Sequence, residues 1–444
     1  MKILFINNFF SSYGGTETIM YNQASILSQN GHEVFFFATD KGPYFEKNYK
    51  YAQFFPKYVD YKSLNKSDAL KYLLKPFYNN DAKVKLKAYL DIIKPDIAHC
   101  HNICYHLTPS VIEPCKKRNI PVVMTLNDPR LMCPGGTLMY KNQTYFREQY
   151  CISGNVSHCI LNRCKNNSLK ASFIATAENL YNKMNGFYDL IDIFLCPSHA
   201  MRNLAINSGI NPDKLVVLNN FIKESFLEVK PKYSDKGYFF YAGRLAGEKK
   251  INHLIQAMSK LPDIKLHIAG KGPEEKNLKK LTKSLNALNV NFLGFLSGKK
   301  LEEEYKNCIA TILPCDWFET FGLTIVESYA YGKPVIASKI GAIPELVENY
   351  SNGIVFQPGN IDELAASINK LYVDRSFAVE MGKKNREKAV NFFSIETHYK
   401  NLINIYDSLW DVRQNKKKNF LTVNTPIIES NTGLQDKLGV LTNS

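Results

Sequence analysis

Two glutamates and a glycine within the stretch Pro314–Gly332 have the types and the spacing needed to bind a phosphorylated polyol. Glu319 precedes an expected short helix that starts near Phe321, and Glu327 lies inside that helix, with seven residues between the two glutamates. Gly322, in the first turn, lets a ligand approach backbone N–H groups at the positive end of the helix dipole. A carboxylate that accepts hydroxyl groups beside such an anion site indicates a sugar nucleotide. Two surface glutamates would show the same spacing.

Two cations lie in the loop after the apolar run Tyr238–Ala242, which is expected to be a strand. Arg244 and Lys249 at the carboxyl end of a strand suit a diphosphate, because they neutralise it on binding and stabilise it as it leaves. Two basic residues in a loop can equally be solvated surface. Their place in a repeating pattern of strands and helices therefore matters.

That pattern runs through most of the chain. Strands are expected at Ile3–Ile6, Glu33–Ala38, Asp96–Cys100, Pro121–Leu126, Ile191–Cys196, Tyr238–Ala242, Lys265–Ala269, Val290–Leu293 and Ala310–Leu313. Helices are expected up to Gln29 with Thr16 as the cap, near Lys83–Ile93, and at Pro109–Arg118, His199–Asn207, Ile251–Lys260, Glu274–Leu288, Gly298–Asn307, 361–371, 375–390 and from Ser394 to about Trp410. Such alternation predicts an α/β protein with parallel sheets, whose ligands bind at the carboxyl ends of the strands.

Three loops after strands are therefore candidate sites in the first half: Asn7–Gly15, His99–Asn102 and Asn127–Cys133. Gly14 and Gly15 open a helix, where a glycine turn presents N–H groups to a phosphate or to an acceptor. Such a pair can also be only a turn. His99 and His101 would share one face of their strand, but nothing nearby completes a metal site.

Several motifs of the second half occur in an order that resembles a known family. They are Gly243-Arg244-Leu245, Glu248-Lys249, Leu266–Pro273, Val290–Phe295, the opening stretch, and Gly332–Ala337. Over roughly residues 1–410 the chain resembles the retaining glycosyltransferases of the GT-B fold, family 4 of the bacterial sugar transferases (glycosyltransferase group 1). The resemblance implies two Rossmann-like parallel-sheet domains that face each other across a cleft. The second domain would hold the donor nucleotide and the first the acceptor.

The resemblance also assigns roles to matching positions. Arg244 and Lys249 would hold and stabilise the diphosphate leaving group, Glu319 would bind hydroxyls of the donor sugar, and Glu327 would accept the ribose hydroxyls. Backbone N–H groups near Phe321, Gly322 and Leu323 would add to the phosphate site. The remaining expected contacts are Gly14 and Gly15 beside the donor diphosphate and sugar, Gly270, Gly294 and Phe295 in the nucleobase pocket, and His101 and Asn127 on the acceptor side.

Two positions depart from the pattern of the family. Many relatives carry histidine where this chain has Asn127, which cannot exchange a proton near neutral pH but can hydrogen-bond a hydroxyl. This argues against an obligatory general base there and fits transfer in which the leaving diphosphate accepts the proton of the acceptor. Lys250 stands where the family has glycine after the lysine, which adds charge and can shift the loop.

Cysteines in an insertion after an active-site strand leave one question open. Cys133, Cys151, Cys159 and Cys164 are separated by 17, 7 and 4 residues, unlike the paired spacing typical of zinc sites. They are expected to be either a structural zinc clip or unpaired thiols. No metal is expected at the donor, because no Asp-x-Asp motif stands where a metal would bridge phosphates and the two cations can replace it.

The expected domain organisation follows these elements. An acceptor-binding domain spans 1–217 with the insertion near 133–170, a linker spans 218–236, and the nucleotide-sugar domain spans 237–393. A helix over 394–412 would cross back onto the first domain, and 413–444, with Lys416, Lys417 and Lys418, reads as a polar, mobile tail.

The composition is that of a globular protein with an excess of positive charge. The 444 residues include 56 Lys and Arg against 41 Asp and Glu, a formal net charge of +15. No nucleic-acid motif accompanies the charge, so the expected partners are a nucleotide sugar and a saccharide or lipid-linked saccharide, with peripheral contact to an anionic membrane. Without a signal peptide or an apolar run of membrane length, the expected location is the cytoplasm, up to the inner face of the plasma membrane.

The predicted function is transfer of a hexosyl or N-acetylhexosaminyl group from a nucleotide sugar to an acceptor hydroxyl, in the assembly of a capsule, exopolysaccharide or lipopolysaccharide. Two alternatives stay open. One is a nucleotide-sugar-binding protein of the same fold without transfer activity, which Asn127 makes conceivable. The other is a nucleotide-sugar epimerase, which would need acid and base groups around the sugar ring. The donor base, the donor sugar and the acceptor are not readable from the residues.

Overall fold

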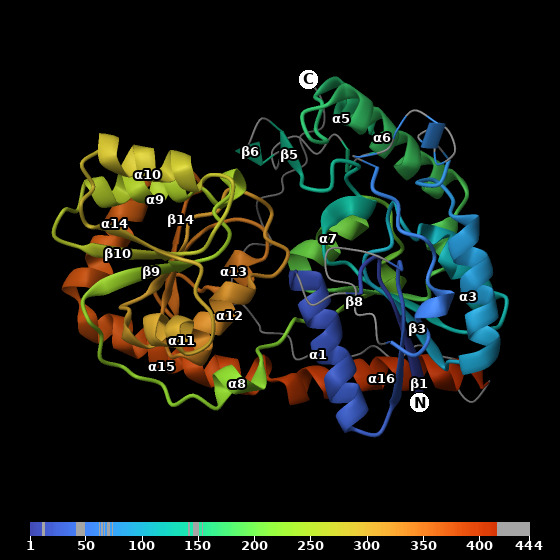
Figure 1. Ribbon diagram of the computed structural model, residues 1–444. Coiled ribbons are helices and arrows are strands. Elements are labelled where there is room, and N and C mark those ends of the chain that lie inside the picture. The colour runs from blue at the N-terminus through green and yellow to red at the C-terminus, as the bar shows by residue number, and fades with distance from the viewer. Residues whose placement is uncertain are drawn as a thin grey trace, which may run out of the picture.

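A computed structural model describes residues 1–10, 14–40, 49–61, 63, 65, 67–68, 72, 74–140, 143–144, 151–152 and 154–414. The predicted tail with its three consecutive lysines lies outside the described residues, apart from 413 and 414. Two parallel six-stranded sheets, each covered by helices, form two domains that lie side by side (Figure 1). The expected architecture of two Rossmann-like domains is confirmed. None of the described helices is long and apolar enough to cross a membrane.

The first domain holds the elements up to β8. Its strands are β1 (Lys2–Ile6), β2 (Glu33–Phe37), β3 (Ile97–Cys100), β4 (Val122–Thr125), β7 (Ile193–Cys196) and β8 (Leu215–Val217), and a separate hairpin joins β5 (Met139–Tyr140) to β6 (Gln143–Thr144). Its α-helices are α1 (Gly15–Gln29), α3 (Asn80–Ile93), α4 (Ile112–Lys116), α5 (Ser157–Leu161), α6 (Leu169–Met184) and α7 (His199–Asn207). Short 3-10 helices are η1 (Ala52–Phe54), η2 (Pro109–Val111), η3 (Pro129–Leu131), η4 (Phe187–Leu190) and η5 (Pro212–Lys214).

The second domain follows the short helix α8 (Glu224–Leu227). Its strands are β9 (Tyr238–Ala242), β10 (Lys265–Ala269), β11 (Val290–Gly294), β12 (Thr311–Leu313), β13 (Val335–Ser338) and β14 (Gly353–Phe356). Its helices are η6 (Gly247–Lys249), α9 (Ile251–Ser259), α10 (Glu275–Ser284), α11 (Gly298–Asn307), α12 (Leu323–Ala330), α13 (Ile343–Leu346), α14 (Ile361–Val373) and α15 (Arg375–Phe392), followed by α16 (Ile395–Arg413).

The order of the strands fixes where each sheet can bind a ligand. The second sheet runs β11-β10-β9-β12-β13-β14, so the chain reverses direction across the sheet between β9 and β12. The first sheet runs β2-β1-β3-β4-β7-β8 and reverses between β1 and β3. Ligands of open parallel sheets bind at the carboxyl ends of the strands that flank such a reversal. The loops that open there are those after β9 and β12 in the second domain and those after β1 and β3 in the first.

Alternating side chains of each strand build the two halves of a domain core. In β1, Leu4 and Ile6 pack toward α3, α4 and α7, while Ile3 and Phe5 pack toward α1 and α16 on the other face. In the second sheet, Phe239 and Tyr241 of β9 pack with α9, α10 and α14. This period of two is the geometry of a strand buried on both faces.

Helix α16 belongs by sequence to the end of the chain but by packing to the first domain. Its buried residues Leu402, Ile405, Tyr406 and Leu409 form one cluster with β1 and α1. Figure 1 shows α15 along the second domain and α16 continuing along the first. Ser394 caps α16, as the sequence predicts, by accepting a hydrogen bond from the backbone N–H of Thr397 at 3.2 Å.

Some expected helix boundaries are wrong. Gly14, not Thr16, is the N-cap of α1 (φ 143°, ψ 161°), so Thr16 lies inside the first turn. Helix α12 starts at Leu323 rather than near Phe321, and Gly322 is its N-cap. The segment after Thr108 divides into η2 and α4, and α10 ends at Ser284, four residues before the expected end. The positions of the domain boundaries stay a prediction.

Candidate active site

The loops that follow β9, β10 and β11 are held together by backbone contacts that only glycine permits. A Cβ on Gly270 (φ 149°) would lie 1.8 Å from the Gly243 carbonyl oxygen, and one on Gly272 would lie 2.1 Å from that of Leu245. Backbone hydrogen bonds join Leu245 N–H to the Lys271 carbonyl (3.0 Å) and Gly270 N–H to the Gly294 carbonyl (2.7 Å). The predicted donor-site glycines thus fix the loop that carries the two cations.

Lys249 and Glu319 meet across the point where the second sheet reverses direction. The Lys249 ammonium lies 3.1 Å from Glu319 Oε2 and 4.8 Å from the centre of the Trp317 ring. Trp317 donates a hydrogen bond from Nε1 to the same Glu319 oxygen at 3.0 Å. Glu319 Oε1 accepts no hydrogen bond from the described residues. The structure therefore brings together two predicted site residues that lie 70 positions apart in the sequence. It leaves Glu319 Oε1 available to a hydroxyl group of a ligand.

The charge of Lys249 is secured by its neighbours. Burial alone would lower the pKa of Lys249, but the adjacent Glu319 carboxylate raises the pKa above its ordinary value. An ammonium that stays charged while little exposed can stabilise negative charge that develops on a ligand. Arg244 differs, because its side chain is exposed and has no hydrogen bond or ion pair with the described residues.

Lys250, at the position where the family has glycine, is held in the loop by contacts with the loop after β12. It adopts the left-handed conformation (φ 49°, ψ 38°) that a glycine would take with less strain. Its ammonium lies 3.8 Å from a carboxylate oxygen of Asp316, in the loop after β12. The backbone N–H of Asp316 also donates to the Glu248 carbonyl at 3.1 Å. These contacts join the loop of Lys249 to the loop of Glu319.

The start of α12 has the open geometry expected of an anion site. Gly322 is its N-cap in the left-handed region (φ 103°, ψ 59°), and no side chain caps the first turn. A Cβ on Gly322 would lie 3.0 Å from the Ile325 side chain. Phe321 is buried with 2% exposure in the apolar cluster below, and Leu323 packs against that cluster. The Phe321 side chain is thus fixed by packing, while Leu323 stays partly exposed at the first position of the helix.

Glu327 lies one turn further along α12, where burial raises the pKa of its carboxyl to about 7. Tyr305 donates a hydrogen bond from its hydroxyl to Glu327 Oε2 at 3.2 Å. The side chain is only partly enclosed, so an oxygen can still meet hydroxyl groups of a ligand. The arrangement is compatible with the expected role at a ribose.

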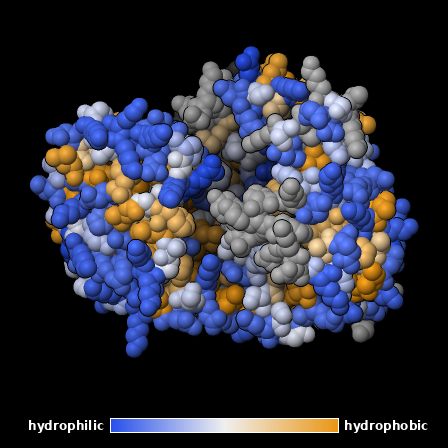
Figure 2. Space-filling model, in the orientation of Figure 1, coloured by the Kyte–Doolittle hydropathy of each residue, from blue (hydrophilic) through white to orange (hydrophobic). Residues whose placement is uncertain are grey.

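The loop that carries Glu319 also contacts the first domain. Phe318 is 2% exposed and belongs to the apolar core of the first domain, and the Thr320 carbonyl accepts a hydrogen bond from the Ser198 hydroxyl at 2.8 Å. Glu319 therefore lies between two residues that bind the opposite domain. The site is built at the boundary of the two domains, and the face shown in Figure 2 is hollowed between them.

On the first domain, an asparagine network joins the loops after β1 and β3. Asn8 Nδ2 donates to Asn102 Oδ1 at 3.3 Å, and the backbone N–H of Asn102 donates to Asn7 Oδ1 at 3.0 Å. Gly14 and Gly15 start α1 beside this network. A Cβ on Gly14 would lie 2.3 Å from Glu17 Oε2, so a carboxylate already stands near the positive end of α1. Glu17 was not among the predicted site residues.

His101 and Asn127 lie together at the ends of β3 and β4. Asn127 Nδ2 lies 3.3 Å from His101 Nδ1, while His101 Nε2 is buried without a hydrogen-bond partner among the described residues. Burial lowers the pKa of His101 to about 3, so the ring is neutral at physiological pH. His99 has a different role, because it is fully buried with both ring nitrogens bonded, to Tyr406 and Thr125 at 2.7 Å each.

Other predicted positions are placed less centrally. Phe295 is 66% exposed, and a Cβ on Gly294 would meet nothing within 4 Å, so their expected nucleobase contacts stay a prediction. The four cysteines of the insertion are free thiols, and no three His, Cys, Asp or Glu among the described residues are grouped to hold a metal ion.

Several residues in and around the site were not among the predicted ones. Trp317 and Phe318 stand inside the opening stretch, and their aromatic character next to Glu319 is the signal that could have found them. Arg130 follows β4 by five residues and is held by Asn102 and Asp128. Lys165 lies in the insertion, where no periodic pattern places it, so its approach to Arg130 could be seen only in the folded chain.

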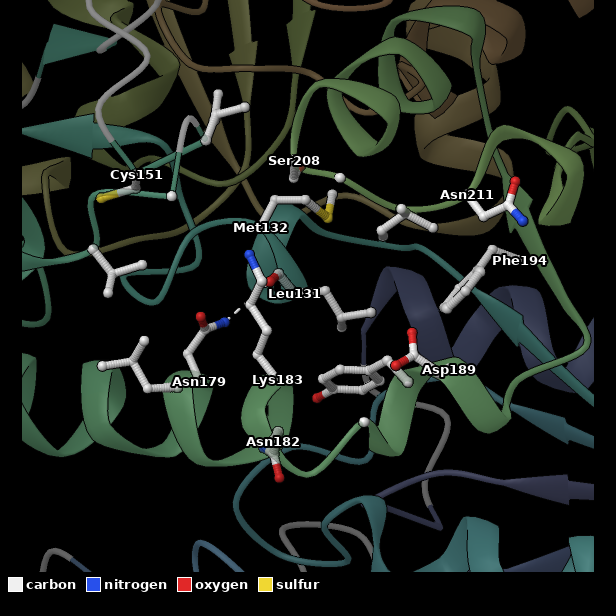
Figure 3. Close-up of a pocket in the computed structure, with 18 of the residues that line it drawn as sticks. Leu131, Met132, Cys151, Asn179, Asn182, Lys183, Asp189, Phe194, Ser208 and Asn211 are labelled. Atoms are coloured by element: carbon white, nitrogen blue, oxygen red, sulfur yellow. Dashed lines mark hydrogen bonds between the residues drawn. The ribbon is translucent and has the colours of Figure 1, made fainter.

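A cavity of the first domain lies apart from the predicted site residues. It has a volume of about 590 Å³ and lies in the first domain between α6, η4, the start of β8 and the segment after β4 (Figure 3). Leu131 and Met132 form one wall, and Asn179 of α6 donates a hydrogen bond to the Leu131 carbonyl at 3.0 Å. The cavity therefore lies next to the loop that carries Arg130, and neither Lys249 nor Glu319 lines it.

Comparison with protein families assigns both halves of the chain. Residues 13–226 match the family described as Glycosyltransferase Family 4, and residues 222–388 match Glycosyl transferases group 1. An uncharacterized glycosyltransferase of Methanocaldococcus jannaschii is 26% identical over 322 residues, which are 71% of this chain and 76% of that protein. The N-acetyl-alpha-D-glucosaminyl L-malate synthase of Bacillus anthracis is 24% identical over 421 residues, 92% of this chain and 97% of that protein.

Solved structures show the same fold at low sequence identity. Anabaena HepE, crystallised with UDP, superposes with a TM-score of 0.62 at 18% identity over 92% of this chain and 100% of that chain. Sucrose-phosphate synthase from Thermosynechococcus elongatus superposes with a TM-score of 0.66 at 16% identity, over 93% and 99% of the two chains. The likeness establishes the GT-B arrangement of the two domains.

Proposed function

Because the chain belongs to the group 1 glycosyltransferases and has their GT-B fold, we propose that it transfers a sugar from a nucleotide-sugar donor to an acceptor hydroxyl with retention of anomeric configuration. The observation that carries the proposal is the Lys249–Glu319 pair at the reversal point of the second sheet. At the domain boundary, the Lys249 ammonium suits the diphosphate of the donor, and the Glu319 carboxylate suits the hydroxyl groups of its sugar.

The proposed chemistry uses these residues without a protein base. The bond between the anomeric carbon and the diphosphate breaks, and the acceptor oxygen bonds to the same face of that carbon. The proton of the acceptor hydroxyl passes to the leaving diphosphate. Arg244 and Lys249 stabilise the charge that develops on the diphosphate, while Glu319 orients the donor sugar through its hydroxyls. We propose that these two cations replace a metal ion.

Asn127 fits this scheme better than a general base would. It is held near His101, whose ring is neutral, so neither side chain exchanges a proton readily near pH 7. Both can still hydrogen-bond the acceptor. Contacts between the domains around Phe318 and Thr320 would exclude water from the donor, since hydrolysis competes with transfer.

The class of donor and the pathway are inferred from relatives. HepE was crystallised with UDP-glucose as well as with UDP, so we propose a uridine nucleotide and a hexosyl or N-acetylhexosaminyl group as the first choice. Related chains include a poly(ribitol-phosphate) alpha-N-acetylglucosaminyltransferase of Staphylococcus aureus. Assembly of a cell-surface polysaccharide on a lipid carrier at the inner face of the membrane is the proposed setting, and the net charge of +15 supports contact with anionic lipid.

The test is release of nucleoside diphosphate from a panel of UDP-, GDP- and ADP-sugars, with and without EDTA. Wild type should release diphosphate slowly from one donor, and EDTA should not change the rate. Lys249→Ala and Glu319→Ala should each lower the release by about 100- to 1,000-fold, the usual loss when a group that stabilises developing charge is removed. Lys280→Ala, an exposed position on α10, is the matched control and should behave as wild type.

Two results would contradict the proposal in different ways. Tight nucleotide binding without release, even with a membrane extract as a source of acceptor, would indicate a binding protein of the same fold. No binding of any nucleotide would mean that the assignment of the loop after β12 is wrong.

A further inference from the structure

Two cations of the first domain converge on one aromatic ring at the acceptor side. The centre of the Tyr105 ring lies 6.0 Å from the guanidinium carbon of Arg130 and 5.4 Å from the ammonium of Lys165. A Cβ on Gly136 would lie 3.4 Å from Arg130 Nε and 3.8 Å from Lys165 Nζ, so the two cations flank one point. Like charges held this close in a partly buried place repel each other unless an anion joins them.

The charges present in the protein do not fully balance this pair. Asp128 lies 3.4 Å from Arg130, and Glu178 is the other carboxylate near the pair. Burial raises the pKa of Glu178 to about 7, so that carboxyl is only partly ionised at neutral pH. Burial, followed by the charge of Arg130, lowers the pKa of Lys165. The cluster therefore keeps an excess of positive charge.

Two buried nitrogens next to the pair lack hydrogen-bond partners. The Arg130 Nε–H donor and His101 Nε2 are both buried without a partner among the described residues, and His101 is only 4% exposed. His101, Asn127 and Arg130 line one small cavity of about 20 Å³, the size of a single water or anion oxygen. Since unpaired buried donors are costly, the site is incomplete as it stands.

The position of the pair relates it to the transferase site. Arg130 donates a hydrogen bond to Asn102 Oδ1 at 3.2 Å, and the same oxygen accepts from Asn8. The cluster thus extends from the loops after β1, β3 and β4, at the edge of the sheet where the acceptor is expected. Tyr105 holds its ring there from a left-handed backbone conformation (φ 68°), which costs a bulky residue free energy and marks a built arrangement.

We propose that Arg130 and Lys165, with Tyr105 beneath them, form a subsite for an anionic group of the acceptor, a phosphate or a carboxylate. This rests on the proposed transfer reaction, because the acceptor is what the first domain would bind. Arg130 would offer its planar guanidinium to two oxygens, while Lys165 would act as a point charge. The acceptor class is then an anionic molecule with a free hydroxyl, such as a glycosyl phosphate, a hydroxy acid or a uronic acid.

The experiment separates this subsite from the diphosphate site of the second domain. UDP, or the nucleoside diphosphate that the donor panel identifies, is first bound to saturation, so that Arg244 and Lys249 are occupied. Methyl phosphate and acetate are then titrated separately by calorimetry, which distinguishes the two sources of anion. The variants are Lys165→Gln, the charge-conserving Lys165→Arg, and the matched control Lys170→Gln at an exposed position on α6.

One of the two anions should bind wild type and Lys170→Gln with equal affinity. Lys165→Gln should bind it about 10- to 100-fold more weakly, the range expected for a hydrogen bond to a charged group, and Lys165→Arg should recover most of the affinity. UDP affinity measured on each variant shows that the protein is folded.

The inference is overturned if neither anion binds the UDP-saturated protein, or if Lys165→Gln binds as wild type does. Failure of UDP to bind at all would instead overturn the proposed function. If Lys165→Gln loses UDP binding as well, the comparison moves to Arg130→Lys, which loses the planar guanidinium. Anion binding by Arg130→Lys that equals wild type would then overturn the inference.

Discussion

At the scale of single residues, the surroundings of a side chain set its charge. Glu319 keeps Lys249 charged, and Asp316 contacts the ammonium of Lys250, whose backbone has a conformation that usually needs glycine. Glu327 is tuned the other way, because burial raises its pKa to about 7 and so favours the neutral carboxyl. Its ionisation in the free protein therefore depends on pH within the physiological range.

Glu327→Gln should make the folded protein less sensitive to pH. In the folded state the pKa of Glu327 is raised from 4.5 to about 7, so its contribution to stability is complete below about pH 4.5 and is lost as the pH rises through 7. Each tenfold change in acidity corresponds to about 1.4 kcal/mol, so the loss is at most about 3 kcal/mol. Urea unfolding at pH 5 and pH 8 measures it.

Glu327→Gln should also weaken nucleotide binding, although it removes the loss of stability at high pH. If Glu327 accepts the ribose hydroxyls, as the resemblance implies, the same variant should bind the nucleotide about 10-fold more weakly at pH 8, since a neutral amide replaces a charged acceptor. Glu396→Gln, at an exposed position of α16, is the control for both measurements. An unchanged pH dependence of stability in Glu327→Gln would show that another group causes it.

At the scale of elements, the turn between β13 and α13 supports the loop of Glu319. The backbone N–H of Ala342 donates to the Glu319 carbonyl at 2.9 Å. A Cβ on Gly341 would lie 2.4 Å from that carbonyl oxygen and 2.7 Å from the Glu319 nitrogen. This turn thus sets the position of a predicted catalytic residue.

Gly341→Ala should therefore lower activity as well as stability. Gly341 and Gly359 both have positive φ (57° and 81°), so alanine at either should cost about 1 kcal/mol of unfolding free energy. Only the Cβ of Gly341→Ala would clash with the Glu319 backbone, so the loop that carries Glu319 must move. A displacement of about 1 Å should lower kcat/KM for the donor by about 100-fold. Gly359→Ala, with nothing within 4 Å, is the matched control. Equal activity of both variants would show that the loop tolerates the shift.

The regular elements were the easiest part to predict from the sequence. The bounds of β9, β10 and α11 agree with the prediction residue for residue, because apolar alternation and helical periodicity are local signals. The cap predicted at Thr16 is wrong because α1 begins earlier, after Gly14. At Gly14 a Cβ would clash with the Glu17 carboxylate, so the chain has glycine there instead of a side chain that caps the helix. Lys165 was missed for another reason, since Tyr105 and Gly136, which its ammonium approaches, lie far away in the chain and no local pattern records such contacts.

At the scale of the whole molecule, a carboxylate of the second domain caps a helix of the first. Glu345 accepts hydrogen bonds from the backbone N–H groups of His199, at 2.8 Å, and Ala200, at the start of α7. The Ser198 hydroxyl, whose oxygen also caps α7, donates to the Thr320 carbonyl. The mutual position of the domains is therefore fixed beside the loop of Glu319.

Glu345→Gln should loosen the contact between the domains. The amide keeps one acceptor oxygen but loses the charge that favours the positive end of α7, at a cost of about 1 to 3 kcal/mol. A fluorescent donor and acceptor on the two domains should report a wider distribution of distances, and UDP should narrow it again. Glu348→Gln, whose exposed side chain makes no hydrogen bond to the described residues, should leave the distribution unchanged.

The packing of α16 has a consequence for synthesis on the ribosome. Leu402 and Tyr406 cover the same face of the first sheet that Ile3 and Phe5 form. All six strands of that sheet are synthesised long before α16 leaves the exit tunnel of the ribosome. One apolar face of the sheet therefore stays uncovered until α16 has been translated. The first domain is thus completed after the second, and a chain that stalls before residue 395 exposes a surface prone to aggregate.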